Sequence, residues 1–402
     1  MNEKLLHTPE GVRDIYNVEC ERKSILEHCL RHRLHLYGFR DIETPMFEFF
    51  DIFNKERGTV PSNEMYKFFD REGNTLVLRP DMTPPIARCM AKYYHEETLP
   101  VRFCYIGDTF VNNTSYQGKL KQVAQLGAEL INDATVEADA EMIALTVDCL
   151  LDAGLKRFQV EIGQADFFRG LMEEAGIAPD EAEILRVLIE NKNMFGVEEI
   201  ISGKNLPDGL KEVILKLPEL FGTLDRLLYV KDKISNSRAL AAIERLEALY
   251  ALLREYGFEE YITFDLGMLS KFNYYTGIIF RAYTFGTGDA VATGGRYDSL
   301  VGQFGKDAPA IGMAIIVNQL LAVLTRQNLL ATPKAKNYLI VYEKEREKEA
   351  IVLVKSMREA DSRAELLLAD AKCDEDYITY AGRMNFLKVI FLKKEGNIEK
   401  LL

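Results

Sequence analysis

The stretch Asp108–Leu130, DTFVNNTSYQGKLKQVAQLGAEL, joins a polar loop that lacks arginine to a run that alternates cleanly. Successive side chains of a β-strand point to opposite faces of the sheet, so this alternation predicts a strand with one apolar face. The apolar face would carry Ala124, Leu126, Ala128 and Leu130, and the other face Val123, Gln125, Gly127 and Glu129. An amide and a carboxylate thus share one face, and we expect the missing side chain of Gly127 to leave room there for something small.

The same stretch predicts an antiparallel pair of strands. VRFCYIGDTF precedes the polar loop at Asn112–Gly118, and KQVAQLGAELI follows it. Two shorter β-like segments, EMYKFFD and NTLVLRPD, lie upstream, and a helix is expected to begin near Thr83, because Pro84 and Pro85 are tolerated in a first turn. Antiparallel strands in this density predict an α+β fold.

The chain of 402 residues is long for a single core, and its length suggests two or three domains. We predict a core over residues 1–327, interrupted by a helical insertion at about 173–256. Residues 328–336 are expected to form a linker. Residues 337–402 carry a compact βαβαβ pattern, which predicts a small C-terminal α/β domain with a parallel sheet.

Composition excludes several classes of protein. The formal charge of -12 repels phosphate backbones, and no local basic patch offsets it, so nucleic-acid binding is not expected. The six cysteines form no C-x-x-C pair, which argues against a disulfide framework and against a thiolate zinc knuckle. No apolar run approaches the roughly 20 residues that cross a bilayer, and the N-terminal residues resemble no secretory signal. We therefore expect a cytoplasmic protein.

Three histidines stand at helical spacing in HCLRHRLH, at His28, His32 and His35, as they do in some zinc sites. The alternative is that they lie on the polar face of an amphipathic helix. No acidic or cysteine ligand accompanies them at a known spacing, so we expect no metal. The glycine-bearing run Gly286–Leu300 matches no phosphate-binding loop, and no nucleophile motif supports a hydrolase.

Polar residues interrupt several apolar strands or stand at their ends. They are Asp81 and Thr83 in LRPDMT, Gln125 and Glu129 in QLGAE, and Tyr274 and Tyr275 in NYYTG. Burying two carboxylates costs several kcal/mol unless a cation or hydrogen-bond donors satisfy them. A bound ammonium group would do so. The alternative is that these residues are exposed on the surface of the sheet.

The same segments closely resemble the core of class II aminoacyl-tRNA synthetases, and specifically histidyl-tRNA synthetase. The matching motifs are TPEGVRDIY, ETPMFEFFDIF, EMYKFFDREGNTLVLRPDMT, FCYIGDTF to QLGAELI, NYYTGIIF, GGRYDSL and AIGMAIIVNQLLAVL, over nearly all of residues 8–325. The resemblance implies a class II synthetase-like antiparallel sheet flanked by helices. It also implies a dimer formed through the region around Pro45.

By similarity, six residues would form a histidine pocket without metal or cofactor. The α-amino group would be held by Asp81, Thr83, Gln125 and Glu129, and the imidazole would be bordered by Tyr274 and Tyr275. Arginines that bind ATP in the synthetases are replaced here by Val111, Ser270 and Gln319. Losing one preorganised charge costs roughly 10²–10³ in rate, so losing three implies that aminoacylation is absent.

The C-terminal segment resembles a truncated anticodon-binding domain without a basic face, which is a poor tRNA reader. This combination resembles the regulatory subunits of short-form ATP phosphoribosyltransferase. Members of that family are catalytically silent synthetase paralogues that assemble with a short catalytic subunit, enable the first step of histidine biosynthesis and are linked to feedback by L-histidine. The alternatives are a histidyl-tRNA synthetase with atypical motifs and a histidine-sensing modulator of another protein.

Overall fold

The computed structural model describes residues 6–53, 60–113, 120–269, 275–330, 337–370 and 373–401. One compact unit comprises the described residues of Met1–Asp14 and Ile25–Leu330, and a second those of Ile15–Ser24 and Ala331–Leu402. Ser270, where an arginine was expected to be lost, and Tyr274, expected to border the imidazole, lie outside the described residues. Within the described segments, no helix combines the length and the apolar composition that a membrane crossing needs.

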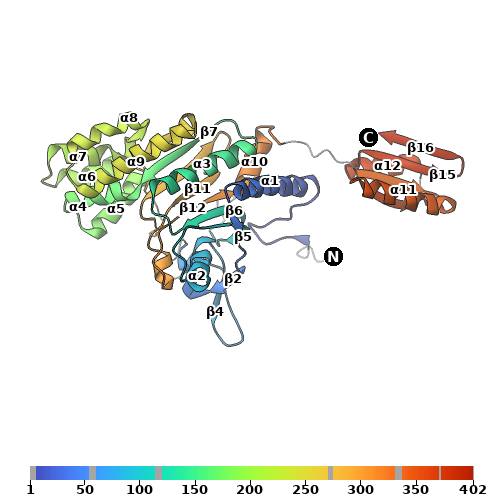
Figure 1. Cartoon of the computed structure of the whole chain (residues 1–402), viewed down its shortest axis with the longest axis horizontal. Helices are drawn as coiled ribbons and strands as arrows, with labels where there is room; N and C mark the ends of the chain where they lie inside the picture. Colours follow the sequence, from blue (N-terminus) through green and yellow to red (C-terminus); the bar gives the residue numbers. More distant parts are fainter. Residues whose placement is uncertain are drawn as a thin grey trace. The chain divides into compact units, whose positions relative to one another are not determined.

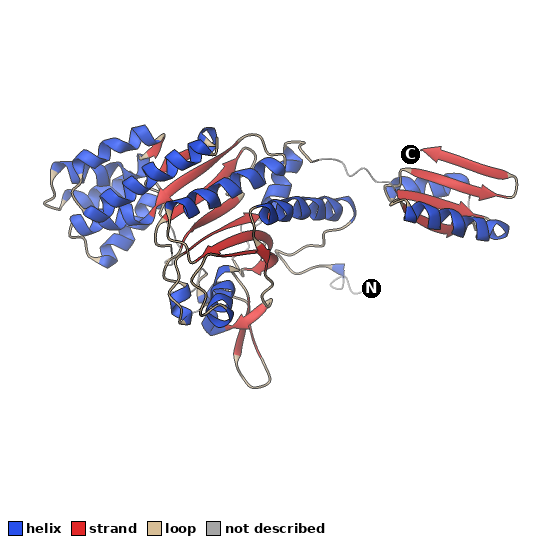
Figure 2. Ribbon diagram, viewed as in Figure 1, coloured by secondary structure: helices blue, strands red, loops and turns tan. Residues whose placement is uncertain are grey.

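A nine-stranded sheet forms the centre of the first unit (Figures 1 and 2). Its order is β1 (Arg40–Asp41), β5 (Val101–Phe110), β6 (Gln122–Ile131), β12 (Ala310–Ile316), β11 (Ala292–Arg296), β10 (Ile278–Thr284), β7 (Phe158–Gln164), β9 (Ile262–Asp265) and β8 (Phe221–Gly222). All neighbours pair antiparallel except β1 with β5 and β7 with β9. The predicted α+β class and the predicted pairing of the two strands that flank the polar loop are confirmed.

Helices cover the two faces of this sheet differently. The apolar face of β6 is buried in one core with α1 (Asn17–Leu36), α3 (Val136–Asp152) and α10 (Val317–Arg326). The opposite face packs against α2 (Thr83–Tyr93), whose Ile86 and Met90 share a second core with Phe103 and Tyr105 of β5. The polar face of β6 therefore lies on the same side of the sheet as the N-terminus of α2.

A small antiparallel sheet stands beside this second face. Its order is β2 (Phe47–Phe49), β4 (Thr75–Leu78) and β3 (Lys67–Phe69), with short 3₁₀ helices at Phe50–Ile52 and Ser62–Glu64. The buried Arg79 fixes it, because its Nε donates to Asp108 O at 2.9 Å and its Nη1 donates to Thr44 O at 2.7 Å. Gly107 makes room for this guanidinium, since a Cβ there would overlap it.

A helical subdomain is inserted between β7 and β9, and Figure 2 shows its helices gathered at one end of the sheet. It comprises α4 (Ala165–Glu174), α5 (Pro179–Glu190), α6 (Met194–Ser202), α7 (Asp208–Lys216), α8 (Leu224–Leu227) and α9 (Ser237–Glu255), with 3₁₀ helices at Leu217–Glu219, Leu228–Lys233 and Glu259–Tyr261. Asn236 caps α9 by accepting from the backbone N–H groups of Arg238 and Ala239. Strand β8 leaves the subdomain to pair with β9, which ties the insertion to the central sheet.

The C-terminal segment forms the sheet of the second unit. Its elements are β13 (Asn337–Tyr342), a 3₁₀ helix at Lys344–Arg346, α11 (Glu347–Glu359), β14 (Arg363–Leu368), α12 (Asp374–Arg383), β15 (Lys388–Lys393) and β16 (Gly396–Leu401). Strands β14, β13 and β15 are parallel, as the βαβαβ pattern predicts. The predicted βαβαβ pattern does not include β16, which pairs antiparallel with β15 at the edge of the sheet. It is exposed along its whole length and so lacks the alternating burial pattern that would have revealed it.

Candidate functional site

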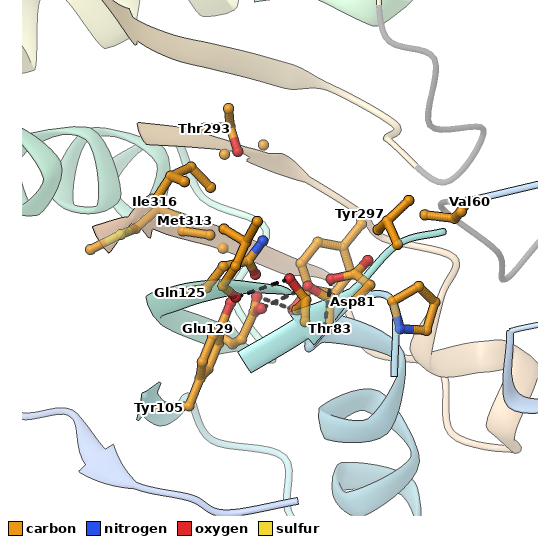
Figure 3. Close-up of a pocket in the computed structure, with 18 of the residues that line it drawn as sticks. Val60, Asp81, Thr83, Tyr105, Gln125, Glu129, Thr293, Tyr297, Met313 and Ile316 are labelled. Carbon is orange, nitrogen blue, oxygen red and sulfur yellow. Dashed lines mark hydrogen bonds between the residues drawn. The ribbon is translucent and has the colours of Figure 1, made fainter. Parts of the chain in front are cut away.

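A cavity of about 350 Å³ opens on the polar face of β6 (Figure 3). Its walls come from the N-terminus of α2 and from strands β5, β6, β11 and β12 with the residues that follow them. The lining includes Asp81, Thr83, Tyr105, Thr109, Val111, Gln125, Glu129, Tyr275, Thr293, Tyr297 and Met313. Segments that are far apart in the sequence thus meet at one small space.

The most deeply buried charged group of this cavity is the carboxyl of Glu129, which is 1% exposed. Thr83 Oγ1 donates to Glu129 Oε1 at 2.9 Å, and Tyr297 Oη donates to Glu129 Oε2 at 2.5 Å. The carboxyl lies against β12 at Gly312, where a Cβ would overlap Oε2. A glycine at that position is therefore required for the carboxyl to occupy its place.

The environment of Glu129 favours its protonated form while no cation is bound. Burial, together with the smaller effect of the nearby Asp81, raises the pKa of Glu129 from 4.5 to about 8, against the opposing effect of the two hydroxyl donors. A cationic ligand placed beside this carboxyl would stabilise the ionised form. The cavity is thus suited to a group that brings a positive charge.

A second carboxyl, that of Asp81, lines the same cavity at the start of α2. Its Oδ1 accepts from the backbone N–H of Thr83 at 3.2 Å, which holds the residue at the helix N-terminus. Among the described residues that line the cavity, none is a lysine or an arginine. A deeply buried carboxyl that accepts only from hydroxyl groups among the described residues, with a second carboxyl in the same lining, favours an ammonium ligand and disfavours a phosphate.

Gly127 does not leave room for a ligand, so that part of the sequence interpretation is wrong. A Cβ on Gly127 would overlap the hydroxyl of Tyr105 and the backbone oxygen of Met313. Tyr105 is the cross-strand partner of Gly127 on β5, and its fully buried phenol occupies the space itself. Burial and the nearby Glu129 raise the pKa of Tyr105 well above its usual value, so the hydroxyl stays neutral.

The structure brings together five of the six residues expected to bind histidine. Asp81, Thr83, Gln125, Glu129 and Tyr275 all line the cavity, and Figure 3 labels four of them. The ring of Tyr275 lies against Gly295, where a Cβ would overlap it. The sixth residue, Tyr274, lies outside the described residues.

Two of the three positions where arginine was expected to be missing can be located. Val111 lines the same cavity, and its backbone N–H donates to Lys121 O at 2.9 Å. Gln319 lines an adjoining cavity of about 1050 Å³, where its Nε2 donates to Asp289 Oδ2 at 3.4 Å. An acidic side chain thus stands beside one of the two places where a synthetase would hold phosphate. The third position, Ser270, is not among the described residues.

The second cavity does contain two arginines, Arg13 and Arg326. Arg326 Nη1 donates to the backbone oxygen of Gly286, so this guanidinium is engaged by the hairpin between β10 and β11. The two cavities share Asn113, Leu120, Val123 and Ile316 in their walls and therefore adjoin. The cavity lined by Asp81 and Glu129 and the cavity lined by Arg13 and Arg326 are therefore neighbouring parts of one region.

Sequence reasoning missed Tyr297, although the motif GGRYDSL contains it. The signal available was its position two residues after the glycine pair Gly294–Gly295, on the same strand face as Gly295. It also missed the residue beside it, Arg296, which is buried on the other side of the sheet. Arg296 Nη2 lies 2.6 Å from Asp139 Oδ1, and Arg245 Nη2 lies 2.6 Å from Asp139 Oδ2. This ion triad joins β11, α3 and α9.

Comparisons with known proteins agree with this geometry. The family model of histidyl-tRNA synthetase matches residues 11–320. An ATP phosphoribosyltransferase regulatory subunit from Acetivibrio thermocellus is 40% identical over 401 residues, which cover 99% of this chain and 95% of that protein. A protein of the same name from Ruminiclostridium cellulolyticum is 37% identical, with 98% and 94% covered.

Solved structures give the same result. A crystal structure from Bacillus halodurans, named ATP phosphoribosyltransferase regulatory subunit/histidyl-tRNA synthetase, matches with a TM-score of 0.86 at 30% identity, covering 97% of this chain and 98% of that one. Histidyl-tRNA synthetase from Nostoc shares the fold, with a TM-score of 0.81 at 18% identity and 98% and 96% covered. The resemblance inferred from the motifs is confirmed over almost the full length. The chain belongs to the family of ATP phosphoribosyltransferase regulatory subunits, and its fold is that of histidyl-tRNA synthetase.

Proposed function

We propose that this chain is a non-catalytic subunit that assembles with a short-form ATP phosphoribosyltransferase catalytic subunit in the cytoplasm. In that complex it supports the first step of histidine biosynthesis and carries feedback by L-histidine. Full-length relatives named as regulatory subunits support the assembly. The observation that carries the ligand assignment is the cavity with two carboxyls and no lysine or arginine among its described lining.

The ligand fits this cavity by charge. The α-ammonium group of L-histidine would pair with Glu129 and Asp81, and Gln125 would offer an amide to its polar atoms. The ring of Tyr275 supplies an aromatic wall for the imidazole. Feedback then follows from linkage, because a ligand that binds two assembly states with different affinity shifts their balance, typically by about 1–3 kcal/mol.

The side chains at two positions argue against the synthetase reaction. Adenylation needs fixed positive charge on the phosphates of ATP, and each missing donor or charge costs roughly 10²–10³ in rate. Val111 and Gln319 supply none, and Asp289 adds a negative charge beside the second position. The formal charge of -12 also disfavours tRNA.

Reconstitution tests the proposal. Mixing the purified chain with a short-form catalytic subunit should raise phosphoribosyl transfer above that of the catalytic subunit alone, and added L-histidine should reduce the gain. No gain in transfer would contradict the regulatory role and favour a histidine sensor for another protein. Histidine-dependent ATP–pyrophosphate exchange by this chain alone would instead show a working synthetase.

The proposed dimer involves the region around Pro45. The small sheet that follows it places Phe47, Phe49 and Phe68 on one face, where they are 53%, 55% and 37% exposed. Exposed aromatic clusters of this kind are typical of protein–protein interfaces. We therefore propose that a second copy of the chain covers this sheet.

Phe49→Glu is expected to shift the chain from dimer to monomer, because it places a charge within the apolar face formed by Phe47, Phe49 and Phe68. Sedimentation velocity would measure the shift. Phe195→Glu is the matched control, since Phe195 is 85% exposed on α6 of the helical subdomain and should leave the mass unchanged. An unaltered dimer in the Phe49 variant would contradict the assignment of this sheet as the interface.

A further inference from the structure

His35, Asp41 and Cys104 lie together at the edge of the central sheet. His35 is in the last turn of α1, Asp41 is on β1, and Cys104 is the residue of β5 that pairs with Asp41. His35 Nε2 lies 3.0 Å from Asp41 Oδ2, and Cys104 Sγ lies 3.6 Å from Asp41 Oδ1. One potential ligand atom from each residue falls within 4.8 Å of the others.

The donor set is one nitrogen, one carboxylate oxygen and one sulfur. Zinc binds these ligands at about 2.0–2.3 Å in tetrahedral geometry, which places neighbouring ligand atoms about 3.3–3.7 Å apart. The two observed separations involve different oxygens of Asp41, so the carboxylate would turn and the three side chains would draw together to surround the ion. Thiolate and imidazole together favour zinc over magnesium or calcium, which prefer oxygen ligands.

The three side chains differ in their exposure to solvent. Cys104 is fully buried, while the side chains of His35 and Asp41 are 43% and 42% exposed. An ion would first meet the two exposed ligands, and it would reach the buried thiol when His35 and Asp41 move apart. Arg31 competes for the site, because its Nε donates to Asp41 Oδ1 at 2.8 Å.

We propose that His35, Asp41 and Cys104 bind one zinc ion, with water in the fourth position. Binding would form the Zn–S bond and release the thiol proton to solvent. The ion would join α1, β1 and β5 just before the segment that leads to Pro45. Spacing along helix α1 could not reveal this site, because two of its three ligands come from β1 and β5.

Cobalt(II) serves as the spectroscopic probe of the full-length chain. Wild-type protein should bind one equivalent of cobalt with a thiolate-to-cobalt charge-transfer band, and Zn²⁺ should displace it. Cys104→Ser should lose this band. His35→Ala, at an exposed position that folding tolerates, should weaken binding at least by the roughly 10–100-fold that even outer-shell changes cost.

Three variants serve as controls. His32→Ala removes an exposed histidine of the same helix that is outside the cluster, and Cys20→Ser removes an exposed cysteine; both should bind cobalt as the wild type does. Arg31→Met should tighten binding, because the competing guanidinium is gone. The site is refuted if wild-type protein shows no thiolate band, if the band survives Cys104→Ser, or if His32→Ala weakens binding as much as His35→Ala.

Discussion

Asp139→Ala is expected to lower the free energy of unfolding by about 3–5 kcal/mol, the usual cost of removing one partner from a buried ion pair. Asp139 has no exposed surface and pairs with Arg296, whose side chain is 3% exposed. Without the carboxylate, the guanidinium of Arg296 would remain buried with only the partly exposed Asp298, at 3.2 Å, as its counter-charge. Urea unfolding followed by circular dichroism would measure the loss.

The matched control is Glu141→Ala, two residues further along α3. Glu141 also forms a two-bond pair with an arginine, since Arg102 Nη1 and Nη2 donate to its carboxylate at 2.6 and 2.9 Å. Both side chains of that pair are partly exposed, so its loss should cost no more than about 1 kcal/mol. Equal losses in the two variants would show that burial of the Asp139 triad does not set its contribution.

The ion triad of Asp139, Arg245 and Arg296 is next to the cavity wall in sequence. Arg296 and Tyr297 are adjacent in the chain, and they bond to Asp139 and Glu129 respectively. Arg245, the third member, belongs to α9 of the helical subdomain. A measurement of stability on the Asp139 variant with and without ligand would therefore report on both the core and the cavity wall.

The central fold could be predicted from sequence because its deciding signal is local. The alternation over residues 123–130 assigned the two faces of β6, and the burial of Leu126 and Leu130 in the α1 and α3 core agrees with it. Strand β16 escaped because no face of it is buried. Periodicity detects a strand only when one of its faces is covered.

The cavity was predictable only in part. The motifs supplied Asp81, Thr83 and Glu129, but they did not indicate what fills the space around them. Tyr297 lies 168 residues from Glu129 in sequence, and Gly312 makes room for that carboxyl from a third strand. Such contacts depend on strand order, which the local pattern does not contain. The local pattern also could not show what lies beside Gly127, because the space next to it is filled by Tyr105 of the neighbouring strand.

Glu129→Ala is expected to weaken L-histidine binding by about 1.5–3 kcal/mol, roughly 10–150-fold, the value of a hydrogen bond to a charged group. The proposed ammonium partner of Glu129 would lose its buried counter-charge. Isothermal titration calorimetry would measure the change. Asp108→Asn is the control, because it removes a carboxylate from β5 outside the cavity lining and should leave the affinity unchanged.

The pH dependence of L-histidine binding distinguishes the effect of the charge of Glu129 from that of its size. Because the pKa of Glu129 in the empty cavity is raised to about 8, binding a cation below that pH must first remove the carboxyl proton. Affinity in the wild type should therefore rise with pH between about 6.5 and 8, by up to tenfold per unit, with one proton released. Glu129→Gln keeps the size of the side chain but cannot ionise, so this slope should vanish. A wild-type affinity that is independent of pH, or unchanged binding in Glu129→Ala, would place histidine elsewhere while leaving the proposed assembly with the catalytic subunit intact.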